Sequence, residues 1–111
     1  MIRFLNEVRT EINNRTKMRS QPKESSVENS GVFDGGFSYG QRTGIGAYLY
    51  PNGDYYKGTW INNARNSKGI CLFGNSGAYA GSWNGDEMDG RGIRLFPDGD
   101  IIEGTFKRGA L

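Results

Sequence analysis

A motif of alternating tyrosine, glycine and tryptophan recurs along this chain at a period of 23 residues, from residue 56 to residue 79. It begins as YKGTW and returns as YAGSW, and a related IEGTF starts at residue 102. Aligned without gaps, the copies span 33–55, 56–78 and 79–101, and a half-copy covers 102–111. A period of this length predicts a repeat protein in which each unit packs against its sequence neighbours.

Each unit contains two short alternating runs that are separated by turn sequences. The turns read PNGD at 51–54, GNSG at 74–77 and PDGD at 97–100. Asn-Gly and Asp-Gly pairs are typical of tight hairpin turns, because these residues accept a positive φ. We therefore expect an all-β repeat fold: a single-layer, curved antiparallel meander of about seven strands.

Glycine and aromatic residues alternate on one face of this expected sheet. Residues two apart on a strand share a face, so Tyr56, Gly58 and Trp60 point the same way. A glycine leaves room for a ring to lie across the backbone. We interpret the recurrent glycines as seats for the rings. The structural glycines predicted in this way are Gly35, Gly44, Gly46, Gly58, Gly69, Gly81, Gly90, Gly92 and Gly104.

The opposite face of the sheet is aliphatic along its middle. Ala47, Ile70 and Ile93 form one row, and Leu49, Leu72 and Leu95 form the next. A single sheet with apolar residues on both faces cannot cover both of them by itself. We expect another segment to cover one face and the rings of the other face to remain partly exposed.

Residues 1–30 form a segment of different composition, since all 18 glycines lie at or after Gly31. The apolar spacing predicts a short amphipathic helix over about 2–16, followed by a polar linker. The domain division predicted is therefore 1–30 and 31–111. The helix is expected to cover one face of the sheet or to dock on a neighbouring subunit. Its docking residues would be Ile2, Phe4, Leu5, Val8 and Ile12.

Composition excludes several classes of function. The chain has no histidine, which removes Ser-His-Asp and Cys-His catalysis and histidine-containing metal sites. Residues 31–111 are electrically balanced, with eight charges of each sign, so a nucleic-acid-binding surface is not expected. The acidic cluster Asp86, Glu87 and Asp89 lacks the pattern of a calcium loop and is interpreted as a solvated loop. We expect no catalytic residue, no metal and no cofactor.

A single cysteine, Cys71, cannot form an internal disulfide, which favours a reducing compartment. It alternates with apolar residues and is interpreted as a small buried hydrophobe. No apolar run approaches the length of a membrane span, and the opening residues have too short an apolar core for a secretory signal. The expected location is intracellular: cytoplasmic, cytoskeletal or peripheral to a membrane.

The repeated residues resemble the MORN (membrane occupation and recognition nexus) repeat over 33–111. The elements YKGTW, YAGSW and IEGTF match its first strand, GIG at 44–46 and GRG at 90–92 match the start of its second, and PNGD and PDGD match its turn. The middle unit departs from the pattern at Asn63 and Ser67, so we expect irregular geometry there. The resemblance implies a curved single-layer sheet and non-enzymatic roles in scaffolding, partner docking and membrane association.

We therefore expect a structural or adaptor subunit that binds other proteins of a larger assembly through its aromatic face and its N-terminal helix. An alternative is a membrane-associating module, attached to anionic lipid through the basic residues of segment 1–23. The predicted partner-binding residues are Phe37, Tyr48, Tyr56, Trp60, Tyr79, Trp83 and Phe106.

Overall fold

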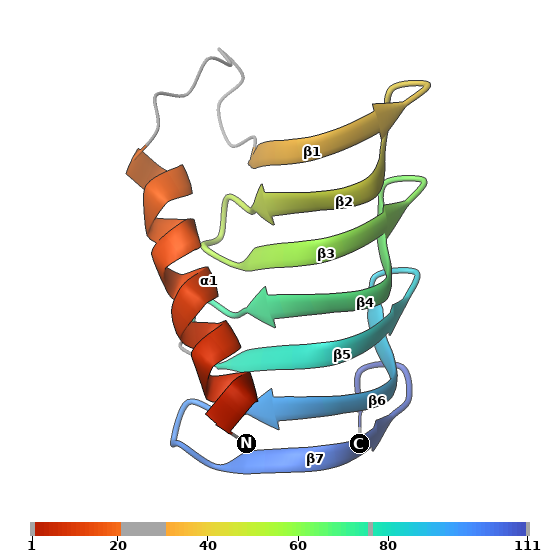
Figure 1. Ribbon diagram of the computed structural model, residues 1–111. Helices are drawn as coiled ribbons and strands as arrows, with labels where there is room; N and C mark the ends of the chain where they lie inside the picture. The colour runs from red at the N-terminus through yellow and green to blue at the C-terminus, as the bar shows by residue number, and fades with distance from the viewer. Residues whose placement is uncertain (1, 21–30, 76, 111) are drawn as a thin grey trace.

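A computed structural model of the 111-residue chain describes residues 2–20, 31–75 and 77–110. One helix, α1 (Ile2–Ser20), precedes a single antiparallel sheet whose strands lie side by side in sequence order, as Figure 1 shows. The predicted fold class is confirmed. The strands are β1 (Val32–Ser38), β2 (Gln41–Leu49), β3 (Tyr55–Ile61), β4 (Ala64–Leu72), β5 (Ala78–Asn84), β6 (Glu87–Leu95) and β7 (Ile101–Phe106).

The hairpins that join β1 to β2, β3 to β4 and β5 to β6 have the same tip geometry. Two consecutive residues at each tip have positive φ, for example Asn62 at 50° and Asn63 at 70°. This backbone matches the twist of the flanking strands. The register also shifts at the same place in each hairpin, between Gly58 and Trp60 in the middle one. The irregular geometry expected of the middle unit is therefore wrong, because asparagine adopts positive φ readily.

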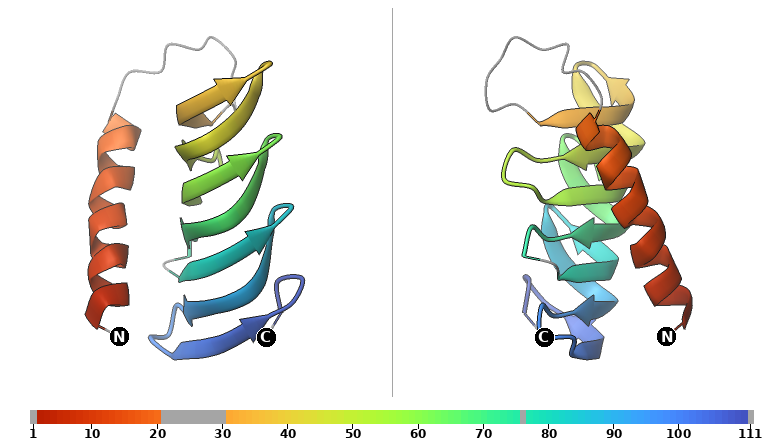
Figure 2. Two further views of the ribbon diagram at one scale, coloured as in Figure 1. Left: turned by 45° about the vertical axis from the view of Figure 1, so that its right-hand side comes forward. Right: turned by 90° about the vertical axis from the view of Figure 1, so that its left-hand side faces the viewer.

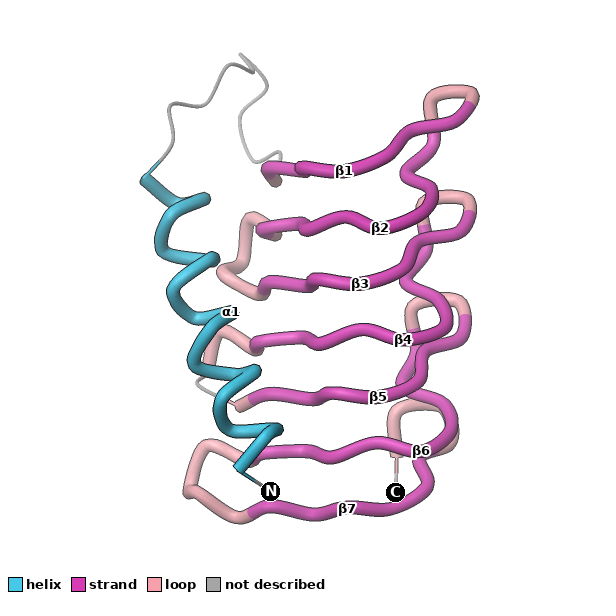
Figure 3. Tube along the Cα trace, in the orientation of Figure 1, coloured by secondary structure: helices cyan, strands magenta, loops and turns pink. Residues whose placement is uncertain are grey.

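The helix α1 lies over one end of the strands on the aliphatic face, as Figures 1 to 3 show. It is longer than the helix predicted over 2–16, so Met18 is helical and is buried against the sheet. Two of the predicted docking residues, Phe4 and Val8, are buried in the same contact. The other three are more exposed, with Ile2 at 77%, Leu5 at 38% and Ile12 at 41%, and their role in docking stays a prediction. The linker residues 21–30 lie outside the described residues, and the division near residue 30 stays a prediction.

Two clusters of buried side chains lie on opposite sides of the single layer. The aliphatic core joins α1 to the sheet, and its buried members are Phe4, Val8, Met18, Ala47, Leu49, Tyr55, Ile70, Leu72 and Ala78. The aromatic core lies on the other side, and its buried members are Tyr56, Trp60, Cys71, Tyr79, Trp83, Met88 and Phe106. The second face, called the aromatic face below, also carries the half-buried rings Phe33, Tyr48, Tyr50 and Phe73.

Candidate binding surface

The deepest layer of the aromatic face consists of rings that lie against glycine backbone. A side-chain carbon added to Gly69 would collide with the ring and the hydroxyl of Tyr56. Gly92 stands in the same relation to Tyr79, and Gly46 to Phe33. Gly44 and Gly90 differ, since no ring lies against them and they have φ of 81° and 104°. Six of the glycines are therefore in close backbone or ring contact, whereas Gly44 and Gly90 allow a positive φ within the strand. The six are Gly35, Gly46, Gly58, Gly69, Gly81 and Gly92.

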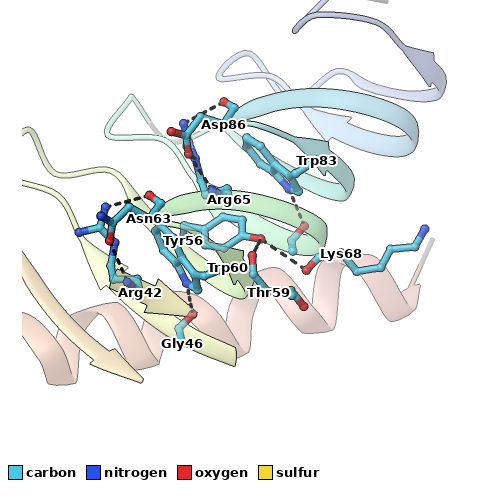
Figure 4. A network of polar contacts seen from close by, with 11 residues as sticks. Arg42, Gly46, Tyr56, Thr59, Trp60, Asn63, Arg65, Lys68, Trp83 and Asp86 are labelled. Atoms are coloured by element: carbon cyan, nitrogen blue, oxygen red, sulfur yellow. Dashed lines mark hydrogen bonds and ion pairs between the residues drawn. The ribbon is translucent and has the colours of Figure 1, made fainter. Parts of the chain in front are cut away.

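The tryptophans bind back to the preceding unit through their indole nitrogens. Nε1 of Trp60 donates to the carbonyl oxygen of Gly46 at 3.0 Å, and Nε1 of Trp83 donates to that of Gly69 at 3.1 Å, as Figure 4 shows. The Tyr56 hydroxyl donates to the carbonyl oxygen of Thr59 at 2.9 Å. These bonds satisfy polar groups that would be costly to bury alone. The two indole hydrogen bonds also join successive repeats.

The rings of this layer pack edge to face along the sheet. The centroid of Tyr56 lies 5.1 Å from that of Trp60 and 5.3 Å from that of Trp83, and Tyr79 lies 5.0 Å from Phe106. As a result Trp60 is only 1% exposed and Trp83 4%. The expectation of partly exposed rings is therefore wrong for five of the predicted partner-binding residues. They are Tyr56, Trp60, Tyr79, Trp83 and Phe106.

Arginine side chains form a second layer over these rings. The guanidinium carbon of Arg42 lies 4.7 Å from the ring centroid of Tyr48, and that of Arg65 lies 4.7 Å from the ring centroid of Trp83. Arg94 lies 4.9 Å from the ring of Phe96. Such cation–π contacts are worth about 0.5–1 kcal/mol at exposed sites. The sequence reasoning missed these residues, although Arg42 and Arg65 stand one repeat period apart.

Two of these arginines also hold the tip of the following hairpin. Nη2 of Arg42 donates to the carbonyl oxygen of Asn63 at 3.0 Å, and the Asn63 side chain accepts from the Arg42 backbone. Arg65 and Asp86 repeat this arrangement, with an added ion pair of 3.1 Å between Nε and Oδ1 (Figure 4). Asp86 of the acidic cluster thus has a structural partner. Among the described residues, no group of three or more histidine, cysteine, aspartate or glutamate side chains could hold a metal ion.

Burial favours the neutral forms of Cys71 and Tyr50 on the aromatic face. Burial raises the pKa of the Cys71 thiol to about 12, although the nearby Arg65 opposes the shift. Burial likewise raises the pKa of the Tyr50 hydroxyl to about 12. A thiol with so high a pKa has almost no thiolate at neutral pH, and the thiolate is the nucleophile. Cys71 is therefore a thiol rather than a thiolate at neutral pH.

The accessible part of the face lies above the buried layer. Phe37 on β1 is 62% exposed, and its ring centroid lies 5.0 Å from that of Phe33. Tyr48 and Tyr50 are half-buried and stack with a centroid separation of 4.4 Å. Of the predicted partner-binding residues, only Phe37 and Tyr48 are thus open to solvent in part.

The structure is that of a β-hairpin repeat protein, in which rings and glycines join one hairpin to the next. A family model described as MORN repeat matches the chain at residues 33–55, 56–78 and 79–101. The chain belongs to the MORN repeat family. A comparison with curated proteins finds no match. MORN repeats are a non-enzymatic module that generally takes part in protein–protein or membrane interactions.

Proposed function

We propose that this chain is a non-enzymatic adaptor that binds a partner protein of a larger assembly through the outer layer of the aromatic face. The observation that carries this proposal is the asymmetry of the sheet. The helix α1 covers part of the aliphatic face, while no described element covers the aromatic face. Figure 2 shows α1 on one side of the sheet only.

The outer layer has the composition of a binding surface. Aromatic and arginine side chains are enriched among the residues that dominate binding energy at protein interfaces. Here half-buried rings such as Tyr50 and Phe73 lie beside the guanidinium groups of Arg65 and Arg94. Phe37 adds an exposed ring at one edge of the sheet. The contact residues proposed are therefore Phe37 and Tyr48 together with Tyr50 and Phe73, rather than the buried tryptophans.

The cellular location of the adaptor is also part of the proposal. The only cysteine is buried and unpaired, which suits a reducing environment. We place the adaptor inside the cell, in the cytoplasm, on the cytoskeleton or at a membrane surface.

The test compares two exposed apolar residues on neighbouring strands and opposite faces. Phe37→Ser changes the aromatic face, and Ile45→Ser is the matched control, since Ile45 is 70% exposed on the aliphatic face. Proteins that co-purify with the wild-type chain from its own cells would be identified by mass spectrometry. A partner retained by Ile45→Ser and lost by Phe37→Ser supports the proposal. A set of partners unaffected by Phe37→Ser and by Tyr50→Ser contradicts it.

A second candidate is membrane attachment through α1, favoured by the exposed apolar residues of this helix. Ile2, Leu5 and Ile12 are exposed there, and the helix carries five cations against two carboxylates. An apolar stripe with basic flanks is typical of helices that lie on anionic membranes. Within the described residues, no helix is long and apolar enough to span a membrane.

Flotation with vesicles of phosphatidylcholine and phosphatidylserine tests this candidate. The wild-type chain should float with these vesicles, and the double variant Ile2→Ser with Ile12→Ser should not. Vesicles of phosphatidylcholine alone are the control for charge. If the wild-type chain stays with the soluble fraction in both cases, the membrane candidate fails.

A further inference from the structure

A groove runs between the first turns of α1 and the middle of the sheet, on the aliphatic face. Its volume is about 770 Å³. Arg3, Phe4 and Glu7 form the wall on the helix side, and the floor includes Ile70 and Ile93. We call it the helix–sheet groove. It is on the opposite side of the sheet from the aromatic face, so it is separate from the surface of the proposed function.

Part of the groove floor is backbone rather than side chain. Gly58, Gly69 and Gly81 line it with backbone alone, and the rings that lie against these glycines are on the other face of the sheet. A groove with an apolar floor and a volume between about 300 and 1,000 Å³ is of the size that binds ligands. It has room for a few residues of extended chain.

The charged side chains that line the groove are mainly basic. Lys57 and Lys68 come from adjacent strands, and Arg3 comes from α1. The single lining carboxylate, that of Glu7, lies 3.9 Å from Arg3. In the part of the chain that the structure describes, neither lysine has a carboxylate partner, and Nζ of Lys68 donates to the Ser82 hydroxyl at 3.1 Å. Two ammonium groups beside an apolar floor are complementary to carboxylates that flank an apolar side chain.

We propose that the helix–sheet groove binds a short, extended acidic segment of a partner protein. An apolar side chain of that segment would pack on Ile70 and Ile93, and the carboxylates on either side would reach Lys57 and Lys68. Charge complementarity of this kind sets specificity and the rate of association more than affinity. The contact would weaken with added salt, since the lysines are partly exposed.

Titration of the ¹⁵N-labelled full chain with two synthetic peptides, followed by NMR, tests the proposal. One probe is the blocked peptide Asp-Glu-Leu-Asp-Glu, and the other is its neutral counterpart Asn-Gln-Leu-Asn-Gln. The acidic peptide should shift the backbone amide signals of Gly58, Gly69 and Gly81 in a saturable way. The neutral peptide should bind at least about fivefold more weakly. Absence of saturable shifts at millimolar acidic peptide would overturn the proposal.

Charge-matched variants distinguish binding of the acidic peptide in this groove from general electrostatic attraction to the protein. The double variant Lys57→Gln with Lys68→Gln should weaken binding of the acidic peptide about fivefold or more. Lys107→Gln with Arg108→Gln removes the same charge from an exposed hairpin outside the groove and should leave binding unchanged. Glu7→Gln removes the one lining carboxylate and should tighten binding. Equal losses in both double variants, or shifts confined to the aromatic face, would overturn the proposal.

A third experiment distinguishes a peptide from a membrane as the ligand of the two lysines. The same double variants would be compared in flotation with phosphatidylserine vesicles. The proposal expects Lys57→Gln with Lys68→Gln to float as the wild-type chain does. Loss of flotation in this variant with unchanged peptide binding would assign the lysines to a lipid surface and overturn the proposal. The result of the Phe37→Ser experiment is independent of every outcome here.

Discussion

The hydroxyl of Tyr55 on β3 donates a hydrogen bond of 2.8 Å to Oε1 of Glu11 on α1. Tyr55 is 1% exposed and belongs to the aliphatic core. The equivalent positions of the other units hold Val32, Ala78 and Ile101, which have no hydroxyl. One unit of the repeat is thus specialised to hold the helix.

Replacement of Tyr55 by phenylalanine should loosen α1 while the sheet stays folded. The change removes a hydrogen bond to a carboxylate, which is worth about 1.5–3 kcal/mol when buried and less at this partly buried position. Hydrogen exchange of the α1 amides should accelerate, with little change in β3 to β5. Tyr39→Phe is the control, because the Tyr39 ring is fully exposed. Unchanged exchange in α1 would show that the Tyr55–Glu11 bond does not hold the helix.

Replacement of Gly69 by alanine should destabilise the sheet strongly. The added carbon would overlap the Tyr56 ring on the adjacent strand, and this ring is fully buried between Trp60 and Trp83. Overpacking of this kind costs about 1–3 kcal/mol. The free energy of unfolding from urea titration measures the loss.

Lys68→Ala is the control for Gly69→Ala, since Lys68 is the exposed neighbour on the other face. This control should change the free energy of unfolding by less than about 0.5 kcal/mol. Equal effects of the two substitutions would contradict the role of Gly69 as a seat for the Tyr56 ring.

Replacement of Ser67 by glycine should stabilise the protein. Ser67 has a φ of 62°. The equivalent positions of the neighbouring units are Gly44 and Gly90, which also have positive φ. A left-handed residue with a side chain costs about 1–2 kcal/mol, partly offset by the greater freedom of glycine in the unfolded chain. The expected gain is about 0.5–1 kcal/mol in the free energy of unfolding.

The reverse substitution, Gly44→Ser, checks the same strain without a steric clash, because no atom lies within 4 Å of the position of the added carbon. It should lower the free energy of unfolding by about the same amount. If both substitutions shift stability in one direction, backbone strain at this position is not the cause.

Alkaline pH should destabilise the protein before its lysines are affected. Burial raises the pKa of Cys71 and of Tyr50 to about 12, and it also raises the pKa values of Tyr55, Tyr56 and Tyr79. In the unfolded chain these groups ionise near about pH 8.5 for cysteine and about 10 for tyrosine. The folded state therefore binds protons more tightly, so stability is full below these values and falls as the pH rises above them.

Urea midpoints measured between about pH 7.5 and about pH 10.5 test this dependence. Cys71→Ala should remove the earliest part of the fall, near about pH 9, and leave the part due to the tyrosines. A midpoint that stays constant over the whole range would show that these groups are not held neutral by the fold.

The repeat and its local geometry were predictable because their causes are close in the sequence. A hairpin tip such as Asn62-Asn63 and the alternation of Tyr56, Gly58 and Trp60 involve residues within a few positions of one another. The side that each residue takes follows from the two-residue period of a strand. The aromatic and aliphatic faces could therefore be assigned from the printed residues.

The exposure of the rings could not be predicted in the same way. Trp60 is buried by Tyr56 from its own strand, by Phe33 two strands away and by the guanidinium group of Arg42. Burial is a sum over such neighbours, and long polar side chains can cover apolar surface. The alternating pattern placed Trp60 on the correct face, but the expectation that its ring is partly exposed was wrong.

The amino-acid sequence alone determined the hairpins, the period of the repeat and the faces of its strands, since these depend on neighbouring residues and on backbone preferences. Tertiary structure decided which face α1 covers, which rings are buried and where a groove remains. Those features depend on contacts such as Tyr55 with Glu11, 44 positions apart. Local pattern does not specify such contacts, because their free energy arises only when distant segments pack together.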